Sequence, residues 1–339
     1  MQNWGVNLKN INVVHISQTP LVGAPGKIAY FLNNLDDIWA VHYFESDYPE
    51  PLKGFFNCHS VKLDSSKVGY NDTVDLFEYQ ICHADVIHIH NNISPGLACR
   101  IADLAPSAKF IYQIHSPLRE PPLHCFQDQN LPFKFALRLV VAQVYPRLYP
   151  EYVMVPNLID SQGCILANEN TALRVMFSPT HRRSERQYYF STKFSPHFDE
   201  VMADVEKSLG NKIIFSCPQK PLPPELLYEW RKLHQVTIDE IETGGFHQVS
   251  YEGLSCGNVV INNADDLSLI SFATALGTGE LPPFIRASES VLKDVLEKLA
   301  SDRDYCESIR RASYEYYVKY MKPQELVKKF ANIYREVLS

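Results

Sequence analysis

The sequence predicts an α/β protein made of two doubly wound parallel sheets. Short apolar runs alternate with longer segments of helical periodicity in both halves of the chain, and this alternation is typical of parallel βαβ units. A length of 339 residues favours two domains over one. A turn at Pro156-Asn157 divides the two sets of segments, so we expect domains at residues 1–156 and 157–315.

The composition narrows the class of protein. Hydrophobic residues make up 45% and charged residues 21% of the chain, as in soluble globular proteins. The net charge of -7 argues against a general nucleic-acid binder. The eight cysteines include no C-x-x-C pair, which favours reduced thiols in a cytoplasmic protein. We see no signal-peptide pattern and no apolar run near the roughly 20 residues of a membrane span, while peripheral contact with a membrane stays open.

The first half of the chain contains several short apolar runs that predict buried strands. These runs lie at residues 11–17, 39–44, 86–90, 110–115 and 153–155. Helical periodicity predicts helices at residues 27–35 and 132–145. Residues 45–75 are rich in Pro, Asn, Asp and Ser, so we expect irregular structure there.

The second half repeats the alternation. Strands are expected at residues 174–178, 213–217, 236–238 and 259–262. Helices are expected at residues 198–209, 224–233, 247–256, 267–276, 288–299, 304–320 and 323–338. Prolines open the helix at 224, as the first turn of a helix allows. Ser288 should cap the helix at residues 288–299, with Glu289 in its first turn.

The stretch 239–264 combines a double glycine, a helix and a strand. Gly244 and Gly245 precede the expected helix, and glycine lets backbone approach a ligand closely. Backbone N–H groups at a helix start are suited to phosphate. Glu252 lies inside the helix, where its carboxylate can accept hydrogen bonds from sugar or ribose hydroxyls, and Gly257 is expected to end the helix. The alternative is an ordinary αβ unit with a glycine-rich loop.

Two features of the first half lie where ligands bind in parallel sheets, at the carboxyl ends of strands. The loop 18–26 follows the first strand and contains Gly23, but it lacks the G-x-G-x-x-G pattern of dinucleotide sites. His115 ends another strand before a proline-rich loop, and a histidine there can donate to a hydroxyl or stabilise developing charge. The alternatives are a plain turn and a histidine bonded to backbone.

A basic loop follows the first strand of the second half. It contains Arg182, Arg183, Arg186 and, further on, Lys193. Arginine suits bidentate phosphate contacts and lysine acts as a point charge, so the loop is typical of a polyanion clamp. The alternative is a solvated surface loop.

We expect no metal site. His88 and His90 share one face of a strand, and two imidazoles can ligate a metal. No carboxylate or cysteine follows at a suitable spacing, so histidines that pack or line a cleft are the preferred interpretation. The pairs Asp36-Asp37 and Asp265-Asp266 are interpreted as surface turns.

With these stretches in order, the chain resembles the GT-B glycosyltransferases, in particular glycosyltransferase family 4. Four stretches carry the resemblance: TPLVGAPGKIAYFLN, IYQIHSP, VPNLID and GGFHQVSYEGLSCGNVVI. The last is the most specific, because glycine, phenylalanine, glutamate, a second glycine and a strand recur at the family's spacing.

The resemblance implies the GT-B fold, with two Rossmann-like domains facing a central cleft. It implies that the segment 316–339 returns as a helix to the first domain. It also implies a nucleotide-diphosphate sugar as co-substrate, held mainly by the second domain, and no cofactor or metal. The implied reaction retains configuration and moves the sugar to a glycan, lipid-linked or other hydroxyl acceptor. The setting it implies is polysaccharide biosynthesis in the cytoplasm, with the inner face of the membrane left open.

The resemblance also assigns roles to individual residues. Glu252 would bind the ribose, and the N–H groups around Phe246 and His247 would meet the diphosphate or the sugar. Lys193 and one of Arg182 or Arg183 would neutralise the leaving diphosphate. The two remaining assignments lie in the first domain: His115 at the sugar and Gly23 beside the donor phosphates or the acceptor.

One position departs from the family. The first glutamate of its E-x7-E motif is replaced by Gly244, and Glu242 lies two residues earlier. Either Glu242 takes the place of that glutamate, or the donor is bound differently. Two further hypotheses are therefore kept, a catalytically silent subunit that binds a partner or glycan, and a sugar-nucleotide epimerase of the same fold. The sequence leaves the sugar, base, acceptor and oligomeric state open.

Overall fold

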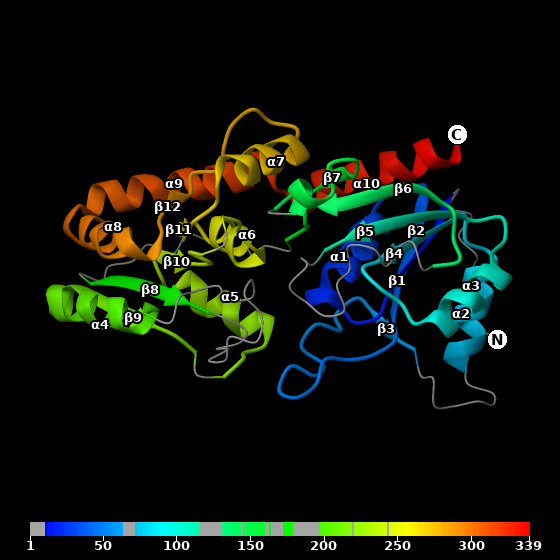
Figure 1. Cartoon of the computed structure of the whole chain (residues 1–339), viewed down its shortest axis with the longest axis horizontal. Coiled ribbons are helices and arrows are strands. Elements are labelled where there is room, and N and C mark those ends of the chain that lie inside the picture. Colours follow the sequence, from blue (N-terminus) through cyan, green and yellow to red (C-terminus); the bar gives the residue numbers. More distant parts are fainter. Residues whose placement is uncertain are drawn as a thin grey trace. The chain divides into compact units, whose positions relative to one another are not determined.

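The computed structural model describes residues 11–63, 72–115, 131–143, 145–159, 163, 172–178, 197–218, 220–242 and 244–339. The chain forms two compact units, each with its own sheet (Figure 1). The first unit comprises Met1–Val140, Glu151–Val153 and Pro323–Ser339, and the second comprises Val141–Pro150 and Met154–Lys322. The sequence analysis places the boundary between the two domains after residue 156 and the end of the second domain at residue 315. Among the described helices, none is long and apolar enough to cross a membrane.

The first unit contains a seven-stranded sheet of order β3-β2-β1-β4-β5-β6-β7. Its strands are β1 (Ile11–Ser17), β2 (Ile38–Phe44), β3 (Val61–Lys62), β4 (Val86–His90), β5 (Lys109–Ile114), β6 (Phe135–Val141) and β7 (Val153–Val155). Strands β1 to β6 pair in parallel. The register places His15 of β1 opposite both His42 of β2 and His88 of β4.

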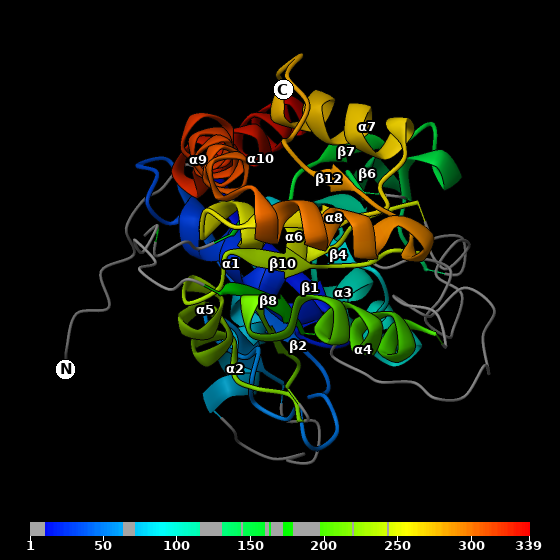
Figure 2. The ribbon, with the colours of Figure 1, turned by 90° about the vertical axis from the view of Figure 1, so that its left-hand side faces the viewer.

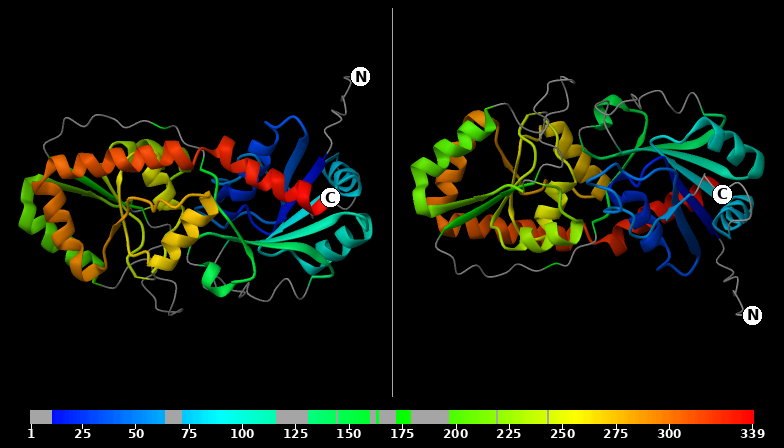
Figure 3. Two further views of the ribbon diagram at one scale, coloured as in Figure 1. Left: turned by 90° about the horizontal axis from the view of Figure 1, so that it is seen from above. Right: turned by 90° about the horizontal axis from the view of Figure 1, so that it is seen from below.

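Helices cover both faces of this sheet. They are α1 (Ala24–Leu32), α2 (Asp72–Cys82), α3 (Pro95–Leu104) and α10 (Pro323–Leu338), and a short 3-10 turn η1 (Leu21–Gly23) precedes α1. On one face, Phe77 of α2 packs on Tyr43 of β2. On the other, Tyr334 of α10 bonds to His88 of β4. Helix α10 also lies against α1 (Figure 3), which confirms the predicted return of the last helix to the first domain.

The sequence prediction is wrong for residues 132–145, where a strand replaces the expected helix. The run FALRLVV forms β6 and pairs with β5. A short apolar run is compatible with both a helix and a strand, and pairing with a neighbouring strand decides which of the two forms. Helices α2 and α3 were not predicted at all, although Ser94 caps α3 by accepting a hydrogen bond from the N–H of Leu97. Helix α1 begins at Ala24 instead of residue 27, because Pro25 stands in its first turn.

The second unit contains a five-stranded sheet of order β12-β11-β10-β8-β9. Its strands are β8 (Leu173–Phe177), β9 (Ile213–Ser216), β10 (Val236–Ile238), β11 (Val259–Asn262) and β12 (Ile285–Arg286). Its helices are α4 (Phe198–Leu209), α5 (Pro224–Lys232), α6 (Gln248–Ser255), α7 (Asp266–Leu276), α8 (Glu289–Ser301) and α9 (Arg303–Tyr320), with short 3-10 turns η3 (Tyr145–Leu148) and η4 (Gly210–Lys212). The helices and the strands β8 to β11 match the predicted ones to within a residue or two, whereas the two-residue strand β12 was not predicted.

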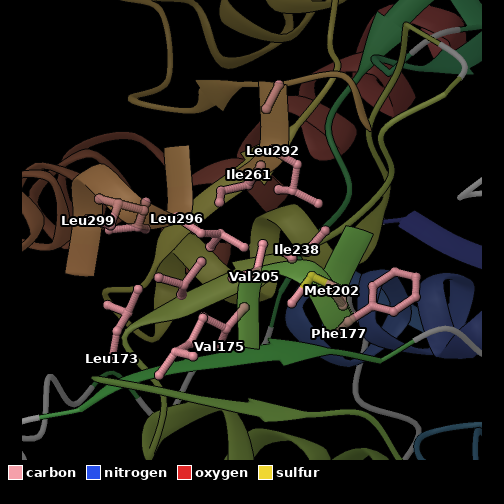
Figure 4. Packing of buried hydrophobic residues seen from close by; sticks show 14 of the residues in the cluster. Leu173, Val175, Phe177, Met202, Val205, Ile238, Ile261, Leu292, Leu296 and Leu299 are labelled. Carbon is pink, nitrogen blue, oxygen red and sulfur yellow. The ribbon is translucent and has the colours of Figure 1, made fainter. Parts of the chain in front are cut away.

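Alternate residues of the strands build the core of this unit (Figure 4). Val175 and Ile261 point to one face of the sheet, where α4 and α8 pack against them. Helix α8 contributes Leu292, Leu296 and Leu299, which recur at the helical period and are fully buried. Burying each such side chain stabilises the fold by about 1.5–3 kcal/mol. Figure 2 shows α8 and α4 side by side over the strands.

Helix α6 packs on the opposite face of the sheet through a glycine. A Cβ atom at Gly253 would lie 2.7 Å from Cγ2 of Val260 and 3.5 Å from Cβ of Thr237. A close approach of helix and sheet therefore requires glycine here. This approach fixes the position of α6 and of every side chain that the helix carries.

Gly253→Ala should lower the free energy of unfolding by about 1–3 kcal/mol, because the added methyl group overpacks the contact with Val260. Urea denaturation followed by circular dichroism measures this change. Gly96→Ala is the matched control, since Gly96 also lies in a helix and an added Cβ meets nothing within 4 Å. The control should be neutral or stabilising by up to about 1 kcal/mol. Equal stability of the two variants would contradict this account of α6.

Candidate functional site

The start of helix α6 is stabilised by carboxylates of the chain itself. Asp239, directly after β10 and buried, accepts hydrogen bonds from the N–H of His247 at 2.5 Å and from Oγ of Ser250 at 2.7 Å. Glu240 accepts one from the N–H of Gly245 at 3.3 Å. A carboxylate here offsets the positive end of the helix dipole. The N–H groups of Gly245 and His247 at this helix start are therefore already bonded within the chain.

Gly244 adopts a backbone conformation that other residues rarely adopt. Its φ is 75°, and a Cβ atom there would lie 3.2 Å from Oδ2 of Asp265. Its carbonyl oxygen accepts from the N–H of Asp265 and from Oγ of Ser268, both at 2.9 Å. A glutamate at this position would be strained and would face a carboxylate. The departure from the family motif is thus built into the local structure.

Asp265 holds the loop that contains Gly244, since its N–H donates to the carbonyl of Gly244. Its side chain caps α7 by accepting from the N–H of Ser268, and Arg147 donates to both of its oxygens at 2.8 Å. Burial alone would raise the pKa of Asp265, but these hydrogen bonds from Arg147 and Ser268 lower it. Glu242 is exposed, and partial burial together with the nearby Glu289 raises its pKa.

Phe246 belongs to the core of the second unit. Its ring contacts those of Tyr251, Phe272 and Phe284 at centroid distances of 5.3–5.6 Å, and its side chain is fully buried. The hydroxyl of Tyr251 donates to the carbonyl of Ala142 at 3.3 Å. Phe246 therefore anchors the loop before α6, and only its backbone is left for contact with a ligand.

Glu252 is paired with a buried arginine that the sequence analysis missed. Nη2 of Arg231 lies 2.8 Å from Oε2 of Glu252, and Nε2 of Gln248 donates to Oε1 at 3.0 Å. The side chain of Arg231 is 1% exposed and that of Glu252 is 12% exposed. Each carboxylate oxygen keeps a further lone pair. Glu252 is thus a rigid acceptor with capacity for hydroxyl donors.

Arg231 lies at the end of α5, where a charged residue ordinarily indicates an exposed position. It also approaches Oγ1 of Thr237 and Oγ of Ser178, each at 3.4 Å. A buried charge requires a partner, because its desolvation is costly. The only sequence signal was an arginine on the helix just before β10, which does not distinguish burial from exposure.

Glu252→Ala should lower the free energy of unfolding by about 3 kcal/mol, because it leaves the Arg231 guanidinium buried without its carboxylate. Asp266→Ala is the control, since its pair with Arg286 is exposed and its loss should cost less than about 1 kcal/mol. Chemical denaturation of both variants measures the difference. If Glu252→Ala is no less stable than Asp266→Ala, the ion pair does not hold this part of the unit together.

In the first unit, His115 is joined to other histidines. Its Nε2 lies 2.8 Å from Nδ1 of His90, and Nε2 of His90 lies 2.9 Å from Nδ1 of His15. The N–H of His115 donates to Oδ1 of Asn91 at 2.7 Å. Burial lowers the pKa of His115 to about 3, so its ring is neutral near pH 7. It can orient or polarise a hydroxyl but carries no charge of its own.

Gly23 ends the η1 turn after β1. Its φ is 76°, it caps α1, and its N–H donates to the carbonyl of Pro20 at 2.9 Å. The structure thus brings Gly244, Gly245, Phe246, His247 and Glu252 together in the second unit, while His115 and Gly23 lie in the first. The predicted cations Arg182, Arg183, Arg186 and Lys193 fall outside the described residues.

Comparison with known proteins supports the fold. No family model matches the sequence, and no curated protein matches it. HepE from Anabaena, solved with UDP-glucose, has a TM-score of 0.61 at 11% identity, over 96% of this chain and 100% of that one. A glycosyltransferase from Rickettsia africae has a TM-score of 0.59 at 14% identity, over 97% and 99%. A UDP-N-acetylglucosamine 2-epimerase has a TM-score of 0.53 at 10% identity, over 95% and 94%.

The chain therefore has the GT-B fold, as the sequence predicts. Two parallel α/β sheets and a last helix that packs on the first unit are its elements here. Glycosyltransferases and sugar-nucleotide epimerases are both among the structures that share it with this chain.

Proposed function

We propose that this protein is a glycosyltransferase that uses a nucleotide-diphosphate sugar. The observation that carries the proposal is the Glu252 carboxylate, held at 2.8 Å by a buried arginine and still partly exposed. A carboxylate fixed in this way can accept both hydroxyls of a ribose without losing side-chain entropy on binding. It also stands at the position where the resembling family binds ribose. The GT-B fold supports the proposal, since HepE was solved with UDP-glucose.

The donor diphosphate is assigned to the basic loop after β8. Asp239 and Glu240 already bond to N–H groups of Gly245 and His247, so added negative charge beside them needs cations. Lys193 with Arg182 or Arg183 is proposed to supply these. Negative charge grows on the leaving phosphate during transfer, and fixed cations stabilise it as it develops. The proposed transfer needs no metal and retains configuration.

His115 is proposed to contact the transferred sugar as a neutral hydrogen-bonding group, with Gly23 beside the donor phosphates or the acceptor. The proposed acceptor is a glycan, a lipid-linked saccharide or another hydroxyl compound. Polysaccharide biosynthesis in the cytoplasm, at the inner face of the membrane for a lipid-linked acceptor, is the proposed setting.

Binding of nucleotide diphosphates and their sugars, measured by isothermal titration calorimetry, tests the donor assignment. One base should bind, and the double variant Arg231→Met with Glu252→Leu should bind it at least about tenfold more weakly, since hydrogen bonds to charged groups contribute about 1.5–3 kcal/mol. The double variant removes both charges together, so it should keep its fold. Lys207→Ala, an exposed lysine on α4, is the control and should bind as the wild type.

Two results would contradict the donor assignment. If no nucleotide binds the wild type, the protein is better explained as a partner-binding subunit. If the folded double variant binds as tightly as the wild type, Glu252 serves only the fold.

A sugar-nucleotide epimerase is the second candidate, favoured by the likeness to the UDP-N-acetylglucosamine 2-epimerase and by Gly244 at the position of the family's first glutamate. Proton NMR of the donor, with protein but no acceptor, separates the two functions. A transferase should leave the sugar configuration unchanged and hydrolyse the donor slowly. Conversion to the epimer without any acceptor would replace the transferase proposal.

A further inference from the structure

Three buried histidines converge in the first unit. His15 comes from β1, and His88 and His90 come from the adjacent strand β4. All three are fully buried. Each offers one ring nitrogen, and these atoms all lie within 4.8 Å of one another.

Hydrogen bonds at Nδ1 hold the rings of His88 and His90. Nδ1 of His88 lies 2.9 Å from the hydroxyl of Tyr334, and Nδ1 of His90 lies 2.8 Å from Nε2 of His115. The two rings stack with centroids 4.1 Å apart. Metal-binding histidines are usually held in this way, by a hydrogen bond at the nitrogen that does not bind the metal. Nε2 of His88 is therefore available for an ion, and Nε2 of His90 becomes available once an ion replaces its hydrogen bond to Nδ1 of His15.

Several buried polar atoms of this cluster have no hydrogen-bond partner among the described residues. Nε2 of His88, Nε2 of His15 and both amide atoms of Gln113 are buried without a partner among the described residues. Gln113 lies beside His90 in the register of β5 and β4. Buried polar atoms of this kind ordinarily bond to water or to an ion. His42 differs, since both of its nitrogens are bonded, to Ser17 and Ser60.

The charge state suits a metal ion. Burial lowers the pKa of His15 to about 3 and the pKa of His88 and His90 well below the usual value, and the charges of neighbouring histidines add to this. Neutral imidazole is the form that binds metals. An ion would also replace the proton shared by Nδ1 of His15 and Nε2 of His90, which lie 2.9 Å apart.

We propose that His15, His88 and His90 bind one divalent transition-metal ion of the Zn²⁺ class inside the first unit. Nitrogen ligands favour Zn²⁺, Co²⁺, Ni²⁺ or Cu²⁺ over Mg²⁺ and Ca²⁺, which take oxygen. Zn–N bonds of about 2.0–2.1 Å put the ligand nitrogens roughly 3–3.5 Å apart, and the candidate nitrogens lie within 4.8 Å of one another. The role is structural, because the ion lies in a fully buried cluster.

The ion would also fix the tautomer of a residue in the proposed function. With Nε2 of His90 on the metal, Nδ1 of His90 carries the proton and donates it to Nε2 of His115. His115 then carries its own proton on Nδ1. Only this step rests on the proposed function; the metal site stands without it.

Metal analysis of the purified full chain tests the site without nucleotide or acceptor. After expression with added zinc and dialysis against metal-free buffer, the wild type should retain about one zinc ion per chain, measured by inductively coupled plasma mass spectrometry. His88→Gln and His15→Gln should retain little. His83→Ala, which removes an exposed histidine at the end of α2, is the control and should retain as much as the wild type. Chelator should lower the melting temperature of the wild type and of His83→Ala only.

Further results decide the remaining cases. Refolding of the wild type with Co²⁺ should give the visible d–d absorption of a nitrogen-ligated ion. If the glutamine variants fail to fold, the wild-type metal content and its response to chelator decide alone. The proposal would be overturned if the wild type contains no metal and its melting temperature changes neither with chelator nor with added zinc. Equal metal in folded His88→Gln and wild type would do the same.

Discussion

The ion pair between Arg231 and Glu252 is the interaction on which the second unit and its proposed site both depend. Arg231 comes from α5 and Glu252 from α6, and the guanidinium is almost fully buried. Removing either partner leaves a charge in a medium of low dielectric, which costs more than an ordinary surface contact. The same pair holds the carboxylate rigid at the position where a ribose is expected. Stability and ligand recognition are therefore coupled in one side chain, and loss of activity in a Glu252 variant would not by itself identify a ligand contact.

The loop before α6 shows how local structure explains a departure from a family motif. Asp239 and Glu240 use their carboxylates to hold N–H groups of the loop and of the first helical residues. Gly244 turns with a positive φ against Asp265, which Arg147 holds in place. A glutamate is not readily accommodated at 244. The proposed donor contact therefore relies on other groups, and the basic residues Arg182, Arg183 and Lys193 of the sequence are the ones proposed to supply them.

Most of the fold is predictable from the sequence, because a regular spacing of apolar residues along a segment indicates a strand or a helix without knowledge of its neighbours. The limits of α4 and β4 were predicted to the residue. The sequence predicts a helix where β6 forms, since only the pairing of this segment with β5 makes it a strand. Arg231 and His15 were missed for a related reason. Arg231 looks like a surface charge until α5 and α6 pack, and His15 meets His88 only through the register of β1 and β4.

Amide hydrogen exchange with and without a nucleotide-diphosphate sugar tests the central claim most directly, because it locates the ligand on the chain. The account predicts added protection in residues 239–256 and in the basic loop that contains Lys193, with little change in α4 and α8. Protection of α6 would place the ligand beside Glu252. A bound sugar nucleotide that leaves both segments unchanged, or that protects only other parts of the chain, would contradict the assignment of the donor to this site.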